Sequence, residues 1–166
     1  MEIGEYEAVV PLQSLLHKTI QRTLDIPVVR AKLDVVKSKV KGKVTLSASY
    51  KWGCDGTDIG KVYQEGAGSD GDNFVDTVLV SQMALLEIRC LETGDVILLN
   101  EFANSAHSSR PIRIAFEKED IDSVQREYAR VTDQVNNVSP LEPEDGVTVT
   151  FEDFPTLFDG KYLGFI

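Results

Sequence analysis

Residues 36–52 read VKSKVKGKVTLSASYKW. Apolar or small residues alternate there with lysine and hydroxyl side chains, as on a β-strand whose successive side chains point to opposite faces. We therefore expect Val44, Leu46, Tyr50 and Trp52 to enter the core. On the opposite face, the pattern predicts a ladder of four lysines: Lys37, Lys39, Lys41 and Lys43.

The start of the longer run from Val28 to Trp52 fits two interpretations. Four apolar residues have a helical spacing, but the density of β-branched side chains favours a strand, which we predict. A typical strand has about 5–6 residues, so we expect either a bent pair of strands turning near Lys41-Gly42 or one long projecting arm. The residues with helical spacing are Val29, Leu33, Val36 and Val40.

The rest of the chain contains both helix and strand patterns. Apolar periodicity predicts helices over residues 11–24 and 119–136, and a hairpin over 84–102 with its turn at 92–95. Further strands are expected at 74–81, 83–91, 112–116 and 147–151, although 83–91 also fits a helix. We therefore predict a single α+β domain over residues 1–166, with a mainly antiparallel sheet.

Charge is distributed unevenly along the sequence. Residues 1–52 contain nine basic and five acidic residues, a net charge of +4. Residues 53–166 contain eight basic and 22 acidic residues, a net charge of −14. The two parts attract each other, within one molecule or between molecules, which favours a protein partner or copies of the chain over nucleic acid.

The sequence also leads to an expectation about the protein's location. The first seven residues carry acids where a signal peptide has a basic region, and no apolar run approaches the ~18 residues that span a bilayer. We expect a soluble, cytoplasmic protein, or one incorporated in a virion assembled there, that forms a homo-oligomer and does not bind membranes. We expect no cofactor and no metal.

A long loop is predicted between Gly53 and Asn73, because glycine and aspartate are dense there. Aligning Gly60 with the invariant glycine of an EF-hand puts Gly66 where that motif needs a bidentate glutamate, so the match fails. A different cation site is left open, with Asp70, Asp72 and Asp76 as ligands.

A serine-rich loop around His107 is the one place that invites a catalytic interpretation. Neighbours in sequence do not establish a triad, and the chain has neither a Gly-x-Ser-x-Gly elbow nor a phosphate-binding loop. Of the two cysteines, we expect Cys90 to be a buried strand residue and Cys54 to be exposed beside the glycine loop. Two reduced thiols are expected, with a single bridge as the alternative.

The C-terminal region, residues 151–166, is rich in aromatic residues. Such side chains often anchor a protein partner, but they also fold back onto the chain's own sheet. We predict a non-catalytic interaction or self-assembly protein, such as a virion or tail component, with an acidic inhibitor or a small enzyme using His107 as alternatives. The predicted partner-binding residues are the four lysines together with Phe154, Phe158, Tyr162 and Phe165.

Overall fold

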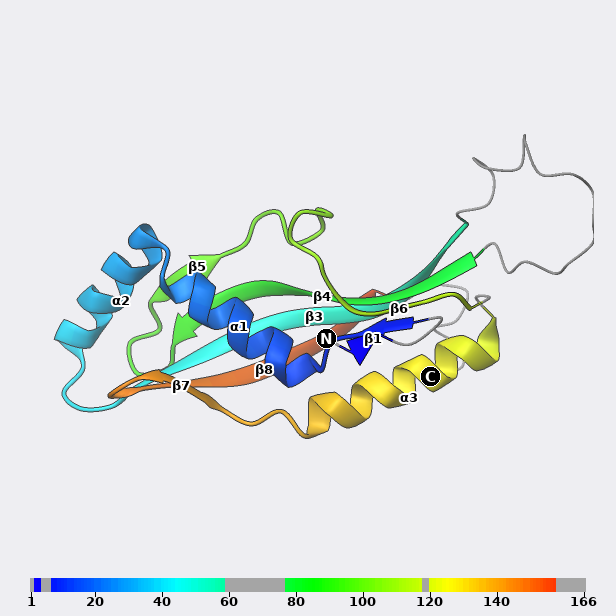
Figure 1. The fold of residues 1–166 in the computed structure, drawn as a ribbon. Coiled ribbons are helices and arrows are strands. Elements are labelled where there is room, and N and C mark those ends of the chain that lie inside the picture. The colour runs from blue at the N-terminus through cyan, green and yellow to red at the C-terminus, as the bar shows by residue number, and fades with distance from the viewer. Residues whose placement is uncertain (1, 4–6, 59–76, 118–119, 158–166) are drawn as a thin grey trace, which may run out of the picture.

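The computed structural model describes residues 2–3, 7–58, 77–117 and 120–157. Within these residues the chain forms three helices and one curled, mostly antiparallel sheet of eight strands (Figure 1). The predicted α+β class is confirmed, as are the N-terminal amphipathic helix and the helix near residues 119–136.

The elements and their bounds follow in chain order. They are β1 (Glu2–Ile3), β2 (Glu7–Val9), α1 (Leu12–Leu24), α2 (Pro27–Lys39), β3 (Val44–Asp58), β4 (Thr77–Cys90), β5 (Val96–Leu99), β6 (Arg110–Ala115), α3 (Ile121–Asn136), β7 (Leu141–Glu144) and β8 (Val147–Leu157).

The long strands β3 and β4 form the centre of the sheet. The strand order is β1-β2-β6-β4-β3-β8-β7, and β5 pairs with the part of β4 that β6 leaves open. β3 runs antiparallel to β4 and parallel to β8. The predicted core residues of β3 are confirmed, because Val44, Leu46, Tyr50 and Trp52 are all buried.

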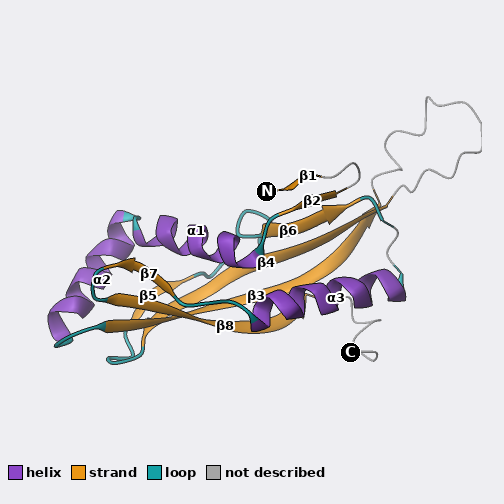
Figure 2. Ribbon diagram, turned by 60° about the horizontal axis from the view of Figure 1, so that its bottom comes forward, coloured by secondary structure: helices purple, strands orange, loops and turns teal. Residues whose placement is uncertain are grey.

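The helices of the described chain pack on one face of the sheet (Figure 2). Leu12 and Leu16 of α1 join Val131 of α3 in a cluster with Tyr50 and Trp52. The helix α2 packs at the other end of the same face, where its buried residues meet Val44 and Leu46 of β3. The opposite face of the sheet therefore has no helix covering it in the described residues.

The prediction of strand for residues 28–40 is wrong. The segment is the helix α2, which starts with Pro27 at its first position, where proline's missing N–H costs no hydrogen bond. Its buried residues are those with helical spacing, Val29, Leu33 and Val36. Burial of this stripe against the sheet outweighs the weak strand preference of β-branched residues.

The chain does turn at Lys41-Gly42, but between a helix and a strand. Gly42 has φ of +120°, which residues with a Cβ rarely adopt. The predicted turn at 92–95 is confirmed between β4 and β5, and Gly94 there also has a positive φ of 75°.

Several other boundaries differ from the predictions. The loop does not begin at Gly53, because β3 continues to Asp58, and the expected strands 74–81 and 83–91 are one strand, β4. Residues 139–146, between α3 and β8, contain the short strand β7. The aromatic C-terminal region begins within β8. The predicted strand at 112–116 is confirmed as β6.

A buried ion-pair cluster fixes α3 to the sheet. The side chain of Glu127 is only 2% exposed, and its carboxylate accepts hydrogen bonds from Arg130 Nη2 at 2.5 Å and Arg113 Nη1 at 3.2 Å. Arg113, from β6, also binds Glu7 of β2. Burial alone raises the pKa of Glu127, but hydrogen bonds from Arg130 and Ser81 and the charges of both arginines outweigh it and lower that pKa.

Candidate protein-binding surface

The four lysines do not form one ladder. Lys37 and Lys39 lie in the last turn of α2, and Lys41 and Lys43 follow in the turn that leads to β3. Residues two apart in a helix point in different directions, so these side chains do not share a face. The predicted common strand face is therefore wrong, whereas partner binding by these residues stays a prediction.

Three of the four lysines form ion pairs within the chain. The pairs join Lys37 to Glu144 at 3.0 Å, Lys39 to Asp95 at 2.8 Å and Lys43 to Glu142 at 2.7 Å. They connect α2 and the turn after it to β7 and to the turn before β5. Exposed pairs of this kind contribute little stability and can exchange partners when another acidic surface approaches.

The same contacts shift the pKa of the carboxylates. A hydrogen bond from Lys37 is the largest cause for Glu144 and, with Arg30, lowers its pKa despite partial burial. A hydrogen bond from Lys39 likewise lowers the pKa of Asp95. In the described part of the chain, Lys32 and Lys41 form no ion pair, so these exposed cations are available to another molecule.

An apolar groove lies between α2 and β5. Val28 and Val35 of α2 are 64% and 54% exposed, although both lie on a helix whose other face is already buried. The groove has a volume of about 450 Å³, and we call it the α2–β5 groove. It is lined by Val28, Ala31, Lys32, Val35, Val36, Lys39, Asp95, Val96 and Ile97.

The strand β5 gives this groove a backbone edge. Among the described strands, β5 pairs only with β4, so its other edge has no strand partner there. An unpaired edge presents N–H and C=O groups to which another chain can add a strand. Val96 and Leu99, at the ends of β5, are 36% and 60% exposed, so the edge is apolar as well as open.

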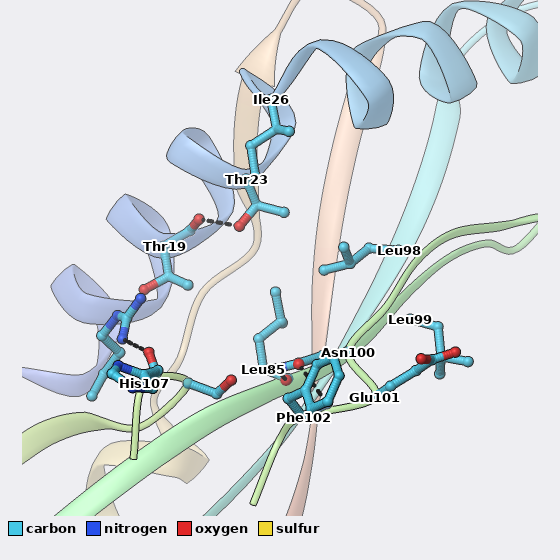
Figure 3. Close-up of a pocket in the computed structure, with 12 residues that line it drawn as sticks. Thr19, Thr23, Ile26, Leu85, Leu98, Leu99, Asn100, Glu101, Phe102 and His107 are labelled. Carbon is cyan, nitrogen blue, oxygen red and sulfur yellow. Dashed lines mark hydrogen bonds between the residues drawn. The ribbon is translucent and has the colours of Figure 1, made fainter. Parts of the chain in front are cut away.

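A second depression, of about 300 Å³, lies between α1 and the loop after β5. Thr19 and Thr23 of α1 line one side, and Phe102 and His107 of the loop line the other (Figure 3). Both threonine hydroxyls donate hydrogen bonds to carbonyl oxygens of α1, Thr19 to Leu15 and Thr23 to Thr19. Neither hydroxyl is therefore positioned as an activated nucleophile.

His107 lies in this depression as an exposed loop residue. His107 forms two hydrogen bonds through its backbone: its N–H donates to Ser105 Oγ, and its carbonyl oxygen accepts from Arg110. Within the described residues, its imidazole ring has no hydrogen bond to a hydroxyl, thiol or carboxylate. The geometry thus adds no support to a catalytic role.

The aromatic residues of the C-terminal region are only partly described. Phe154 lies on β8 and is 41% exposed, on the side of the sheet that has no helix among the described elements. Phe158, Tyr162 and Phe165 lie outside the described residues. Their predicted role in partner binding stays a prediction.

Both cysteines are buried, and neither forms a disulfide among the described residues. Cys90 is buried in β4, as predicted, but the exposure predicted for Cys54 is wrong, because β3 continues past it and packs it with Leu79 and Val124. In the β3–β4 ladder Cys54 lies opposite Ser81, nine residues along β4 from Cys90, far beyond the reach of a disulfide.

No group of three or more potential metal ligands occurs among the described residues. The candidate cation ligands Asp70, Asp72 and Asp76 lie outside them, so that prediction has no test here. Within the described residues, no helix combines the length and the apolar character needed to cross a membrane.

The α2–β5 groove was not predicted from the sequence. Once residues 27–39 are read as a helix, Val28, Ala31 and Val35 form a second apolar stripe beside the buried one. A single sheet covers only one apolar stripe of a helix, so the second stripe stays exposed. That signal was hidden because the same residues were interpreted as strand.

Neither known family models nor the sequences of curated proteins match this chain.

Proposed function

We propose that this protein is a non-catalytic self-assembly protein whose α2–β5 groove receives a neighbouring copy of the chain. The observation that carries the proposal is the exposed valine stripe of α2 beside the unpaired edge of β5. Exposed apolar surface next to an open strand edge is a hazard for a protein that stays monomeric. A lasting partner removes that hazard.

Charge favours a second copy as the occupant. Residues 26–43 contain six basic residues and one acidic residue, whereas the whole chain has a net charge of −10. The groove is lined by two of these lysines, Lys32 and Lys39, on a molecule that is otherwise acidic. An acidic surface of the next copy would complement these lysines, whereas two grooves facing each other would bring lysines together.

The contact would accordingly join different surfaces of the two copies. Such a heterologous contact closes into a ring or continues as a filament. Repeated assemblies of this kind occur in virions and phage tails, which is the setting we propose for this protein.

The test is the molar mass of the purified full chain, measured by light scattering at low and high ionic strength. We expect an oligomer at low salt that dissociates as salt screens the lysines of the groove. Val35→Asp, which places a charge in the groove, should yield a monomer under both conditions. Phe116→Asp changes a residue that is 60% exposed on another part of the surface, so it should assemble like the wild type.

Two results would overturn the proposal. One is a wild-type monomer at both ionic strengths, and the other is equal assembly of Val35→Asp and Phe116→Asp. A one-to-one complex with a cationic protein, without self-association, would instead favour the acidic inhibitor.

A further inference from the structure

Lys51 is a buried lysine on the face of the sheet opposite the helices. It lies in the centre of the sheet on β3, beside Ala84 of β4 and Phe154 of β8. Its neighbours Tyr50 and Trp52 point to the helix side, so Lys51 points away from it. The residue is only 6% exposed, although lysine is among the residues least often buried.

A depression of about 440 Å³ opens above Lys51. The loop after β5 forms one wall and β8 contributes an aromatic ring. The lining residues are Lys51, Leu86, Asn100, Glu101, Ala103, Asn104 and Phe154. This volume is sufficient for a small organic molecule.

The ammonium group of Lys51 has one hydrogen-bond acceptor among the described residues, the side-chain oxygen of Asn104. The other asparagine of the pocket is already engaged, because the amide of Asn100 donates to the Leu85 carbonyl and accepts from the Phe102 N–H. No carboxylate of the described chain forms an ion pair with Lys51. Burying a cation with a single neutral partner costs free energy that a bound anion offsets.

We propose that this pocket, the Lys51 pocket, binds a small organic monocarboxylate with an apolar body. The carboxylate receives hydrogen bonds from the Lys51 ammonium, whose two remaining N–H groups have no acceptor in the described chain. Leu86, Ala103 and Phe154 provide the apolar contacts.

Glu101 disfavours the binding of anions that carry several negative charges. Its carboxylate lines the same pocket, so it repels a ligand that carries several negative charges, such as phosphate. A singly charged carboxylate gains the attraction of Lys51 while meeting less of this repulsion. Ligand binding here is independent of the proposed self-assembly, because the Lys51 pocket and the α2–β5 groove share no lining residue.

The test is an NMR titration of the full chain, following the lysine side-chain CεH₂ signals. The probes are phenylacetate and hexanoate, with phenylacetamide as the neutral analogue and inorganic phosphate as the polyvalent anion. We expect saturable shifts of the Lys51 signal with the two carboxylates only. Phenylacetamide and phosphate should bind at least about tenfold more weakly, since a hydrogen bond to a charged group is worth about that factor.

Two variants assign the site. Lys51→Met removes the charge and keeps most of the side-chain volume, and it should weaken phenylacetate binding at least about tenfold. The control Lys18→Met removes an exposed lysine of α1 that lines neither the pocket nor the groove, and it should leave binding unchanged. Phe154→Ala, which keeps the charge, should also weaken binding and serves as a second test if Lys51→Met does not fold.

Three results would overturn the proposal. They are the absence of any saturable shift with both carboxylates, equal affinity of Lys51→Met and Lys18→Met for phenylacetate, and tighter binding of phosphate than of phenylacetate.

Discussion

Two buried charges, Glu127 on the helix side of the sheet and Lys51 on the opposite side, have contrasting surroundings. Both are almost inaccessible to water, at 2% and 6% exposure. Glu127 receives hydrogen bonds from two arginines, Arg113 and Arg130. Lys51 has a single neutral partner among the described residues, Asn104.

The contrast separates a charge that holds the fold together from one that does not. Around Glu127, the elements β6 and α3 each contribute an arginine. Removing the carboxylate leaves Arg130 without an ion-pair partner among the described residues and takes one of three acidic partners from Arg113. Around Lys51, no carboxylate of the described residues comes close enough to form an ion pair, so removing the ammonium relieves a cost. Proteins retain such a cost mainly at sites where the residue has a function.

The largest expected effect follows from removing the charge of Glu127. Glu127→Gln should lower the free energy of unfolding by about 3 kcal/mol, the lower end of the range for a broken buried ion pair, because both arginines keep some contact with water. Urea denaturation of the full chain measures this. Asp133→Asn, at an exposed position of the same helix, is the control and should change stability by less than about 0.5 kcal/mol.

If Glu127→Gln and Asp133→Asn had the same stability, the cluster would not hold α3 to the sheet. The distinction between the two buried charges would then be lost.

Lys51→Met should change the free energy of unfolding in the opposite direction and stabilise the protein. The methionine side chain fills nearly the same space without a charge, and the Asn104 oxygen that loses its donor is at an exposed position where water replaces it. We expect the free energy of unfolding to rise by about 1 kcal/mol, as for other buried charges replaced by apolar residues. Thermal unfolding in the absence of ligand measures this, with Lys18→Met, at an exposed position of α1, as the control.

A loss of stability in Lys51→Met, beyond any change in Lys18→Met, would show that Lys51 supports the fold. Lys51 would then resemble Glu127, and the contrast would disappear.

Much of the fold was predictable because its patterns are local. The apolar stripe of α1, the turn at Gly94 and the alternation in β6 each identify an element from a few neighbouring residues. The helix α2 was not predicted, because its valines suit either structure locally. Packing in the core decides between them, and the cluster that α2 joins includes Ile97 of β5 and Val147 of β8, which are distant in the sequence.

The two buried charges were harder to predict. Glu127 falls on the apolar stripe of α3, between Val124 and Val131, and a carboxylate at that position is a signal that sequence alone provides. Lys51 gives no such signal, because a lysine between Tyr50 and Trp52 looks like the solvent face of a strand. Its burial depends on Asn104 and Phe154, which reach it only in the folded chain.

The smallest expected effect is the dependence of the Glu127 cluster on pH. Hydrogen bonds and charges from the arginines outweigh burial and lower the pKa of Glu127 in the folded protein, so it keeps its charge in acid that protonates an unfolded glutamate. The cluster therefore contributes its full stability above the unfolded pKa of about 4.3 and loses it as the pH falls through the folded pKa. The difference in unfolding free energy between wild type and Glu127→Gln, measured by urea denaturation from neutral to acidic pH, should accordingly shrink below pH of about 4.3. A difference that stays constant into this acidic range would show that the packing of the side chain, rather than its charge, holds α3 against the sheet.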